Sequence, residues 1–61
     1  MELKVDISMN NSAFNEAGNG TEAARILRVL ADRIDGIDLQ EDCGTINDSN
    51  GNKVCCWTAD D

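Results

Sequence analysis

The chain has 61 residues, of which 12 are acidic and 5 basic, and it contains no histidine, so its formal net charge is −7 at neutral pH. A chain of about 60 residues forms a single domain with a marginal core, since folding hides only about 60% of its surface. The negative charge disfavours nucleic-acid binding, because phosphates repel an acidic surface, and it leaves two interpretations: a charge that keeps a small protein soluble, or a surface that binds a basic partner.

The first nine residues predict a β-strand. Leu3, Val5, Ile7 and Met9 alternate with polar residues, and this period of two is typical of a strand with one buried face. The alternation does not resemble the basic start and apolar run of a secretory signal, and no segment is long and apolar enough to span a membrane. We therefore expect a cytoplasmic protein that makes no membrane contact.

Residues 10–19 are expected to form a loop, because Asn, Gly and small residues favour turns. The loop has one large apolar side chain, Phe14. We expect Phe14 to fold back onto one end of the core, with a contact to a partner as the alternative.

Residues 20–35 predict an amphipathic helix, because five apolar side chains recur on one stripe at helical spacing: Ala23, Ile26, Leu27, Leu30 and Ile34. Asn19 is expected to cap the first turn, with Glu22 completing a variant of the capping box, and Gly36 is expected to end the helix in the left-handed conformation. Val29 lies away from the stripe, and Ala24 and Ala31 form a small-residue edge on the other side. An exposed Val is ordinary, but this surface is also where a helix of a second copy could approach closely.

Four carboxylates follow the helix closely: Asp35, Asp38, Glu41 and Asp42. They oppose the helix dipole, so they do not serve helix stability. The segment is either a solvated linker or an acidic contact patch, which Asp60 and Asp61 at the C-terminus would extend.

The last third predicts a β-hairpin, because an Asn-Gly pair separates segments 43–48 and 52–58. A type I turn that starts at Asp48, with Gly51 in the left-handed bulge position, would set Ile46 opposite Val54. In this register three side chains face the helix, namely Ile46, Val54 and Cys56, and five lie on the uncovered face, namely Thr45, Asn47, Lys53, Cys55 and Trp57.

The expected fold is therefore α+β, with the order β-α-β-β, a three-stranded antiparallel sheet in which the first strand pairs with the third, and one helix on one face. Trp57 would be the one large apolar side chain on the open face. It is a candidate partner contact, because Trp is enriched in interface hot spots, or else a lid on the end of the sheet.

The sequence gives little support for a metal site, a cofactor site or a catalytic site. Cys43, Cys55 and Cys56 are expected to be reduced thiols, with a disulfide or a metal site as alternatives, and the chain has neither His nor a C-x-x-C pair to complete a metal site. The turn at 48–52 fails as a calcium loop, because its Gly is misplaced and Ala59 stands where a Glu is needed. We expect no enzyme, no metal and no cofactor.

Three motifs follow one another in the chain: Ala13-Phe14, then Glu22-x-x-Arg25-Ile26-Leu27-x-x-Leu30-Ala31-x-Arg33-Ile34 closed by Gly36, and Asp48-x-Asn50-Gly51-Asn52-x-Val54 with Trp57. This combination resembles a group of small proteins encoded by tailed phages and prophages and covers roughly three quarters of the chain. In that group a Gly often follows the Val, whereas Cys55 does here. The resemblance implies a phage-derived protein of the bacterial cytoplasm, and it carries over no catalytic or binding residue.

The leading functional hypothesis is an acidic interaction module that binds a host or phage protein and inhibits it, for example a defence or nucleic-acid-processing protein. Its carboxylates would address a basic groove, as DNA-mimicking inhibitors do; the predicted contacts are Asp35, Asp38, Glu41, Asp42, Trp57 and Val29. The alternative is a homo-oligomeric assembly module, such as a homodimer that uses Val29, the alanine edge or Trp57. A thiol-dependent redox or metal protein is a third interpretation.

Overall fold

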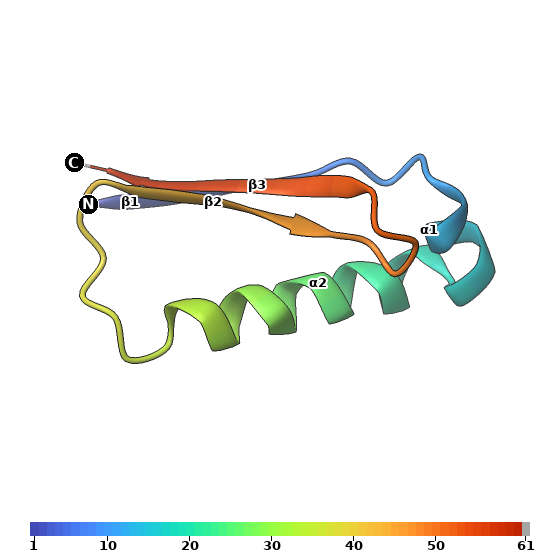
Figure 1. Ribbon diagram of the computed structural model, residues 1–61, viewed down its shortest axis with the longest axis horizontal. Coiled ribbons are helices and arrows are strands. Elements are labelled where there is room, and N and C mark those ends of the chain that lie inside the picture. Colours follow the sequence, from blue (N-terminus) through green and yellow to red (C-terminus); the bar gives the residue numbers. More distant parts are fainter. Residues whose placement is uncertain (61) are drawn as a thin grey trace.

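The computed structural model describes residues 1–60 and shows a three-stranded sheet with two helices (Figure 1). In chain order the elements are β1 (Glu2–Ile7), α1 (Ser12–Ala17), α2 (Asn19–Ile34), β2 (Asp42–Asn47) and β3 (Lys53–Asp60). β3 lies between β1 and β2 and is antiparallel to both. The predicted α+β fold is confirmed. No helix within residues 1–60 has the length and apolar character needed to cross a membrane.

The hairpin follows the predicted turn but not the predicted register. Gly51 has a φ of +87° and donates its N–H to the Asp48 carbonyl oxygen at 3.1 Å, as expected for the left-handed position. Asn47 pairs with Lys53, also as expected, but a bulge follows and Ile46 pairs with Cys55 instead of Val54. The extra residue moves every later β3 side chain to the other face.

The predicted faces of β3 are therefore wrong beyond the bulge. Cys55, Trp57 and Ala59 are buried, whereas Cys56 is exposed. Val54, the extra residue at the bulge, is buried as well. The core consists of side chains from both helices and from the hairpin: Phe14, Ile26, Leu30, Ile46, Val54, Cys55 and Trp57.

The segment predicted as a loop contains the short helix α1. Phe14 is 1% exposed and belongs to the core, so its expected role as a plug is confirmed. The helical turn itself was not predicted. The burial of Ala13 and Phe14 explains the helical turn. In an extended strand these consecutive side chains would point in opposite directions, whereas in a helix both can face the core.

α2 is rotated about its axis relative to the predicted stripe. Leu27 is 47% exposed, whereas Val29 is half-buried and packs against the core. Asn19 is the first helical residue and not its cap, and no side chain caps this end. The predicted end is confirmed, since Gly36, which follows the C-cap residue Asp35, has a φ of +82°.

Candidate protein-interaction surface

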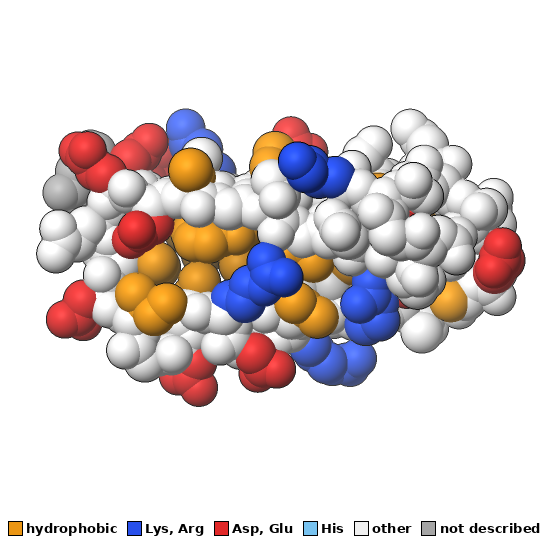
Figure 2. Space-filling view, viewed as in Figure 1, with side chains coloured by type: hydrophobic (Ala, Val, Ile, Leu, Met, Phe, Trp, Pro, Cys, Tyr) orange, Lys and Arg blue, Asp and Glu red, His pale blue; other side chains and the backbone are white. Residues whose placement is uncertain are grey.

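One end of the elongated molecule brings together the start of β1, the end of β3, the end of α2 and the connector to β2 (Figure 1). We call this the acidic end, because six acidic residues lie in these segments: Glu2, Asp35, Asp38, Glu41, Asp42 and Asp60. Glu2 and Asp60 are direct neighbours in the β1–β3 register. Figure 2 shows acidic side chains gathered here, while most visible Lys and Arg side chains lie nearer the middle of the molecule. Asp61 lies outside the described residues.

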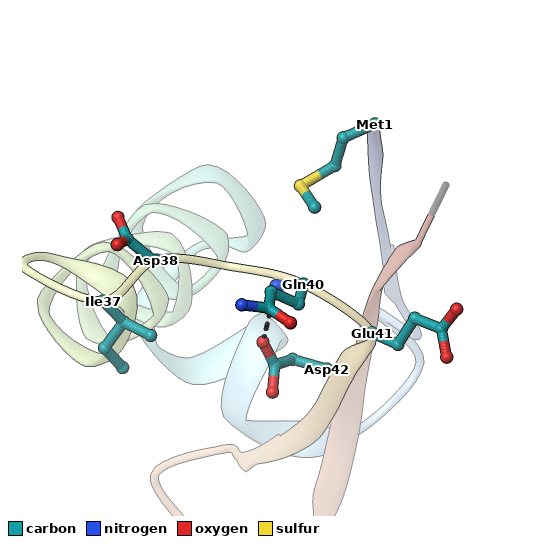
Figure 3. Close-up of a pocket in the computed structure, with 6 residues that line it drawn as sticks. All are labelled: Met1, Ile37, Asp38, Gln40, Glu41 and Asp42. Carbon is teal, nitrogen blue, oxygen red and sulfur yellow. Dashed lines mark hydrogen bonds between the residues drawn. The ribbon is translucent and has the colours of Figure 1, made fainter.

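The acidic end contains an open hollow of about 540 Å³ (Figure 3). Its lining comes from the residue before β1, the connector and the start of β2: Met1, Ile37, Asp38, Gln40, Glu41 and Asp42. Met1 and Ile37 are 67% and 56% exposed, so the hollow presents apolar surface among carboxylates. The Gln40 N–H donates to Asp42 Oδ2 at 2.9 Å and holds that carboxylate in place.

Asp38 and Glu41 differ from Asp42. Figure 3 shows their carboxylates at separate points along the connector, pointing away from each other. Both residues are exposed, and within residues 1–60 neither carboxylate accepts a hydrogen bond. These two groups keep their full hydrogen-bonding capacity for another molecule. Asp35, the fourth predicted contact, ends α2, where its N–H donates to the Ala31 carbonyl oxygen at 3.0 Å.

The other two predicted contact residues do not lie on this surface. The expectation of an exposed Trp57 is wrong: the residue is 9% exposed, and its indole lies against Gly44 on the helix-covered face. Its Nε1 has no hydrogen-bond acceptor among the described residues. Val29 is half-buried and lies beside β2, in a groove that it shares with Arg25 and Arg33.

Arginine side chains cross this groove from α2 to the outer edge of β2. Arg25 Nη2 donates to the Asn47 carbonyl oxygen at 3.1 Å, and Arg33 Nη1 to the Thr45 carbonyl oxygen at 2.7 Å. In Figure 2 basic side chains span apolar atoms between the helix and the sheet. These bonds, the burial of Glu22 and the packing of Val29 on the core all lie on the flank of α2 that faces β2, and together they stabilise the observed rotation.

Glu22 is a buried carboxylate whose role the sequence did not reveal. It accepts bonds from Arg25 Nε at 3.1 Å and Nη2 at 2.9 Å, and from the Ser49 N–H at 2.9 Å. The bonds from Arg25 lower the pKa of Glu22 despite the opposing effect of burial, and the Ser49 N–H lowers it further. The i,i+3 spacing of Glu22 and Arg25 was the available signal.

Asp48 is the second buried carboxylate and organises the hairpin turn. Its Oδ1 accepts the N–H groups of Asn50 at 2.9 Å and Asn52 at 2.8 Å, and its Oδ2 accepts a bond from Asn11 Nδ2 at 3.2 Å. Burial alone would raise the pKa of Asp48, but the bonds from Asn52, Asn11 and Asn50 outweigh it and lower the pKa. Both buried carboxylates are therefore structural.

The three cysteines are free thiols in the structure, Cys43 and Cys56 exposed and Cys55 buried. Burial raises the pKa of the Cys55 thiol, which keeps it protonated at neutral pH. Within residues 1–60, no three Cys, Asp or Glu side chains are grouped so that they could hold a metal ion.

Comparison with models of protein families, with curated proteins and with solved structures found no match. The resemblance to phage-encoded proteins therefore stays a prediction. What the chain does has to be inferred from its own surface.

Proposed function

We propose that this protein is a non-enzymatic binding module whose acidic end docks on a basic surface of another protein. The observation that carries the proposal is the hollow itself, where Asp38 and Glu41 present unengaged carboxylates beside exposed Met1 and Ile37. A one-signed cluster of charge steers a complementary partner during encounter and fixes its orientation.

The mixture of acidic and apolar groups specifies the chemistry of the partner. Lys and Arg side chains combine a charged head with an apolar stem, and they bind best where carboxylates and apolar surface lie together. Lys or Arg side chains that project from a basic surface of the partner fit the hollow, with their aliphatic stems against Ile37. Burial of Met1 and Ile37 on binding would supply affinity that salt does not weaken.

We propose further that the partner is a defence or nucleic-acid-processing protein of a bacterial host, and that binding inhibits it. A groove that accommodates phosphates also accepts carboxylates at comparable spacing, so an acidic end can compete with DNA or RNA for the same site. The net charge of −7 and the resemblance to phage-encoded proteins support this choice. The same resemblance makes the bacterial cytoplasm the proposed compartment.

A matched pair of double variants tests the proposal. D38N/E41Q removes two carboxylates of the hollow, and E16Q/D32N removes two exposed carboxylates of the helices with the same change in net charge. We expect a partner captured from bacterial lysate by the wild-type chain to be lost with D38N/E41Q and kept with E16Q/D32N.

Salt provides a second readout of the same contact. Raising the salt from about 0.15 M to about 1 M shortens the Debye length from about 8 Å to about 3 Å, so capture should weaken steeply. If both variants capture the partner equally, or neither does, the acidic end is not the contact. A captured protein without a basic surface would also contradict the proposal.

A further inference from the structure

The strand β1 has one open edge. The Ser8 N–H donates to the Val54 carbonyl oxygen at 2.8 Å, and the register places Lys4 and Asp6 opposite Thr58 and Cys56. Even-numbered residues of this segment therefore bond to β3. Leu3, Val5 and Ile7 then direct their N–H and C=O groups to the opposite side, because antiparallel strands alternate in this way. On that side the structure of residues 1–60 has no neighbouring strand.

β1 also carries apolar surface that α2 does not cover. α2 contacts β2, and the side chains of Leu3 and Val5 in β1, and of Met9 two residues after it, remain 41%, 39% and 41% exposed. Leu27, 47% exposed, lies on the flank of α2 opposite Arg25 and therefore toward β1. An open, apolar edge of this kind is a template for another strand.

The opposite edge of the sheet is protected. Arg25 and Arg33 occupy the outward carbonyl oxygens of Asn47 and Thr45 on β2, which blocks a strand from pairing there. Among residues 1–60 no such side chain lies over the edge of β1, and the strand has no Pro and no bulge. Of the two edges, β1 is the one left able to pair.

We propose that β1 pairs with β1 of a second copy, antiparallel, about a two-fold axis at Val5. Val5 then lies opposite Val5 of the second copy, and Leu3 lies opposite Ile7. On the other face Lys4 lies opposite Asp6, and this ion pair occurs twice by symmetry. In the monomer Lys4 Nζ is 3.6 Å from Glu2 Oε1, with both side chains more than 60% exposed, so that weak pair leaves Lys4 available.

The sequence of β1 selects this register. Moving the axis to Lys4 would set Lys4 against Lys4 and Glu2 against Asp6, and moving it to Asp6 would set Asp6 against itself. Like charges directly opposite each other are destabilising. Moving the axis to Leu3 restores opposite charges but shortens the pairing to residues 1–5. The axis at Val5 uses residues 1–9. It sets apolar residues opposite apolar ones and Lys4 opposite Asp6, and it leaves Glu2 opposite the uncharged Ser8.

The pairing joins two three-stranded sheets into one continuous sheet with both α2 helices on the same face. Because the β1 strands run antiparallel, the two acidic ends lie at opposite ends of the dimer. This arrangement keeps apart the most negative regions of two chains that each carry a net charge of −7. Of the residues that line the hollow, only Met1 takes part in the pairing, and the variants at Lys4, Val5 and Asp6 that test the pairing lie outside the hollow. This inference and the proposed binding function therefore fail or hold separately.

Charge reversal tests the register in sedimentation equilibrium of the purified chain. In K4D the introduced carboxylate faces Asp6 of the second copy, and in D6K the introduced ammonium faces Lys4. We expect each variant alone to dimerise about tenfold more weakly than the wild type, since two attractive pairs become repulsive. An equimolar mixture of K4D and D6K should recover the wild-type dissociation constant as a heterodimer, because opposite charges face each other again.

A second variant tests the edge without changing charge. Val5→Pro removes an N–H that points away from β3, so the monomer keeps its sheet while the edge loses a donor at the two-fold axis. We expect this variant to be monomeric with an unchanged circular dichroism spectrum. A wild-type chain that stays monomeric up to about 1 mM overturns the inference. The inference is also overturned if all the variants dimerise as tightly as the wild type, or if mixing K4D with D6K does not restore the wild-type dissociation constant.

Discussion

The contact between Gly44 and Trp57 limits what residue 44 can be. The two residues face each other across β2 and β3. A Cβ at position 44 would lie 2.6 Å from Trp57 Nε1, 2.8 Å from Cε2 and 2.9 Å from Cζ2. These distances are shorter than any van der Waals contact, so a side chain here would displace the indole from the core.

We therefore predict that Gly44→Ala lowers the free energy of unfolding by about 1–3 kcal/mol, the usual cost of overpacking a core. Gly20→Ala is the matched control, because a Cβ there meets no atom within 4 Å and the position lies in α2. The control should be neutral or more stable by up to about 1 kcal/mol. Urea unfolding followed by Trp57 fluorescence measures both. Equal stability of the Gly44→Ala variant and the wild type would show that the ring does not pack on Gly44.

At the scale of elements, polar bonds decide how α2 sits on the sheet. Glu22 links the start of the helix to the hairpin turn by accepting a hydrogen bond from the Ser49 N–H. Arg33 links the last turn of the helix to β2 by donating a hydrogen bond to the Thr45 carbonyl oxygen. Apolar burial holds the helix to the sheet but does not by itself fix its rotation. The buried stripe is therefore centred nearer Glu22 and Ile26 than the apolar pattern predicts.

The lowered pKa values of Glu22 and Asp48 predict a fall in stability in acid. Their folded values lie below the ordinary 4.5 and 3.8, so in acid the unfolded chain binds more protons. The two carboxylates contribute fully to the free energy of unfolding at a pH above their ordinary pKa values. This contribution is lost as the pH falls through their lower pKa values in the folded chain. Glu22→Gln should be less stable than the wild type at about pH 7 and should lose less stability on acidification.

Urea midpoints measured across this pH range check the prediction, with Glu16→Gln as the control because Glu16 is exposed on α1. The control should follow the wild-type curve. A Glu22→Gln curve parallel to that of the wild type would mean that Glu22 does not titrate differently in the folded and unfolded chains.

Most elements of the fold were predictable because their signals are local. Alternation in residues 1–9, the stripe of 20–35, and Gly36 and Gly51 each specify a conformation within a few residues. The bulge was not predictable. Val54 and Cys55 are both apolar, so the pattern allows either to face the helix. The observed register buries Trp57 against Gly44, where the missing side chain leaves space for the indole. Segment 12–17 is likewise too short to show a helical period.

The candidate surface was predictable in part for the same reason. Asp35, Asp38, Glu41 and Asp42 are neighbours in the sequence, so their proximity needs no tertiary information. Met1 joins the hollow only because β1 runs antiparallel to β3 and returns the N-terminus to this end. The face of the sheet on which Trp57 lies is set by the bulge. Because the bulge was not predicted, Trp57 was assigned to the wrong face.

The two edges of the sheet differ in their ability to pair with another strand. Arginines close the β2 edge, and within the part of the chain that the structure describes the β1 edge is open. A dimer through β1 leaves only the closed edges exposed, so pairing stops at two copies and does not continue into a fibre. The proposed partner site is present twice on such a dimer, at opposite ends. Two identical binding sites would let it hold two copies of a partner or one symmetric partner.

Amide hydrogen exchange can distinguish the two sides of β1 in one experiment. The amides of Lys4 and Asp6 point to β3 and should exchange slowly at every protein concentration. The amides of Leu3, Val5 and Ile7 point outward and become bonded only in the dimer. If they exchange from the monomer alone, a hundredfold rise in concentration above the dissociation constant should slow them about tenfold, because the monomer fraction falls with the square root of concentration. Equal behaviour of odd and even amides would contradict the pairing, and the even amides report in the same spectra that the sheet is intact.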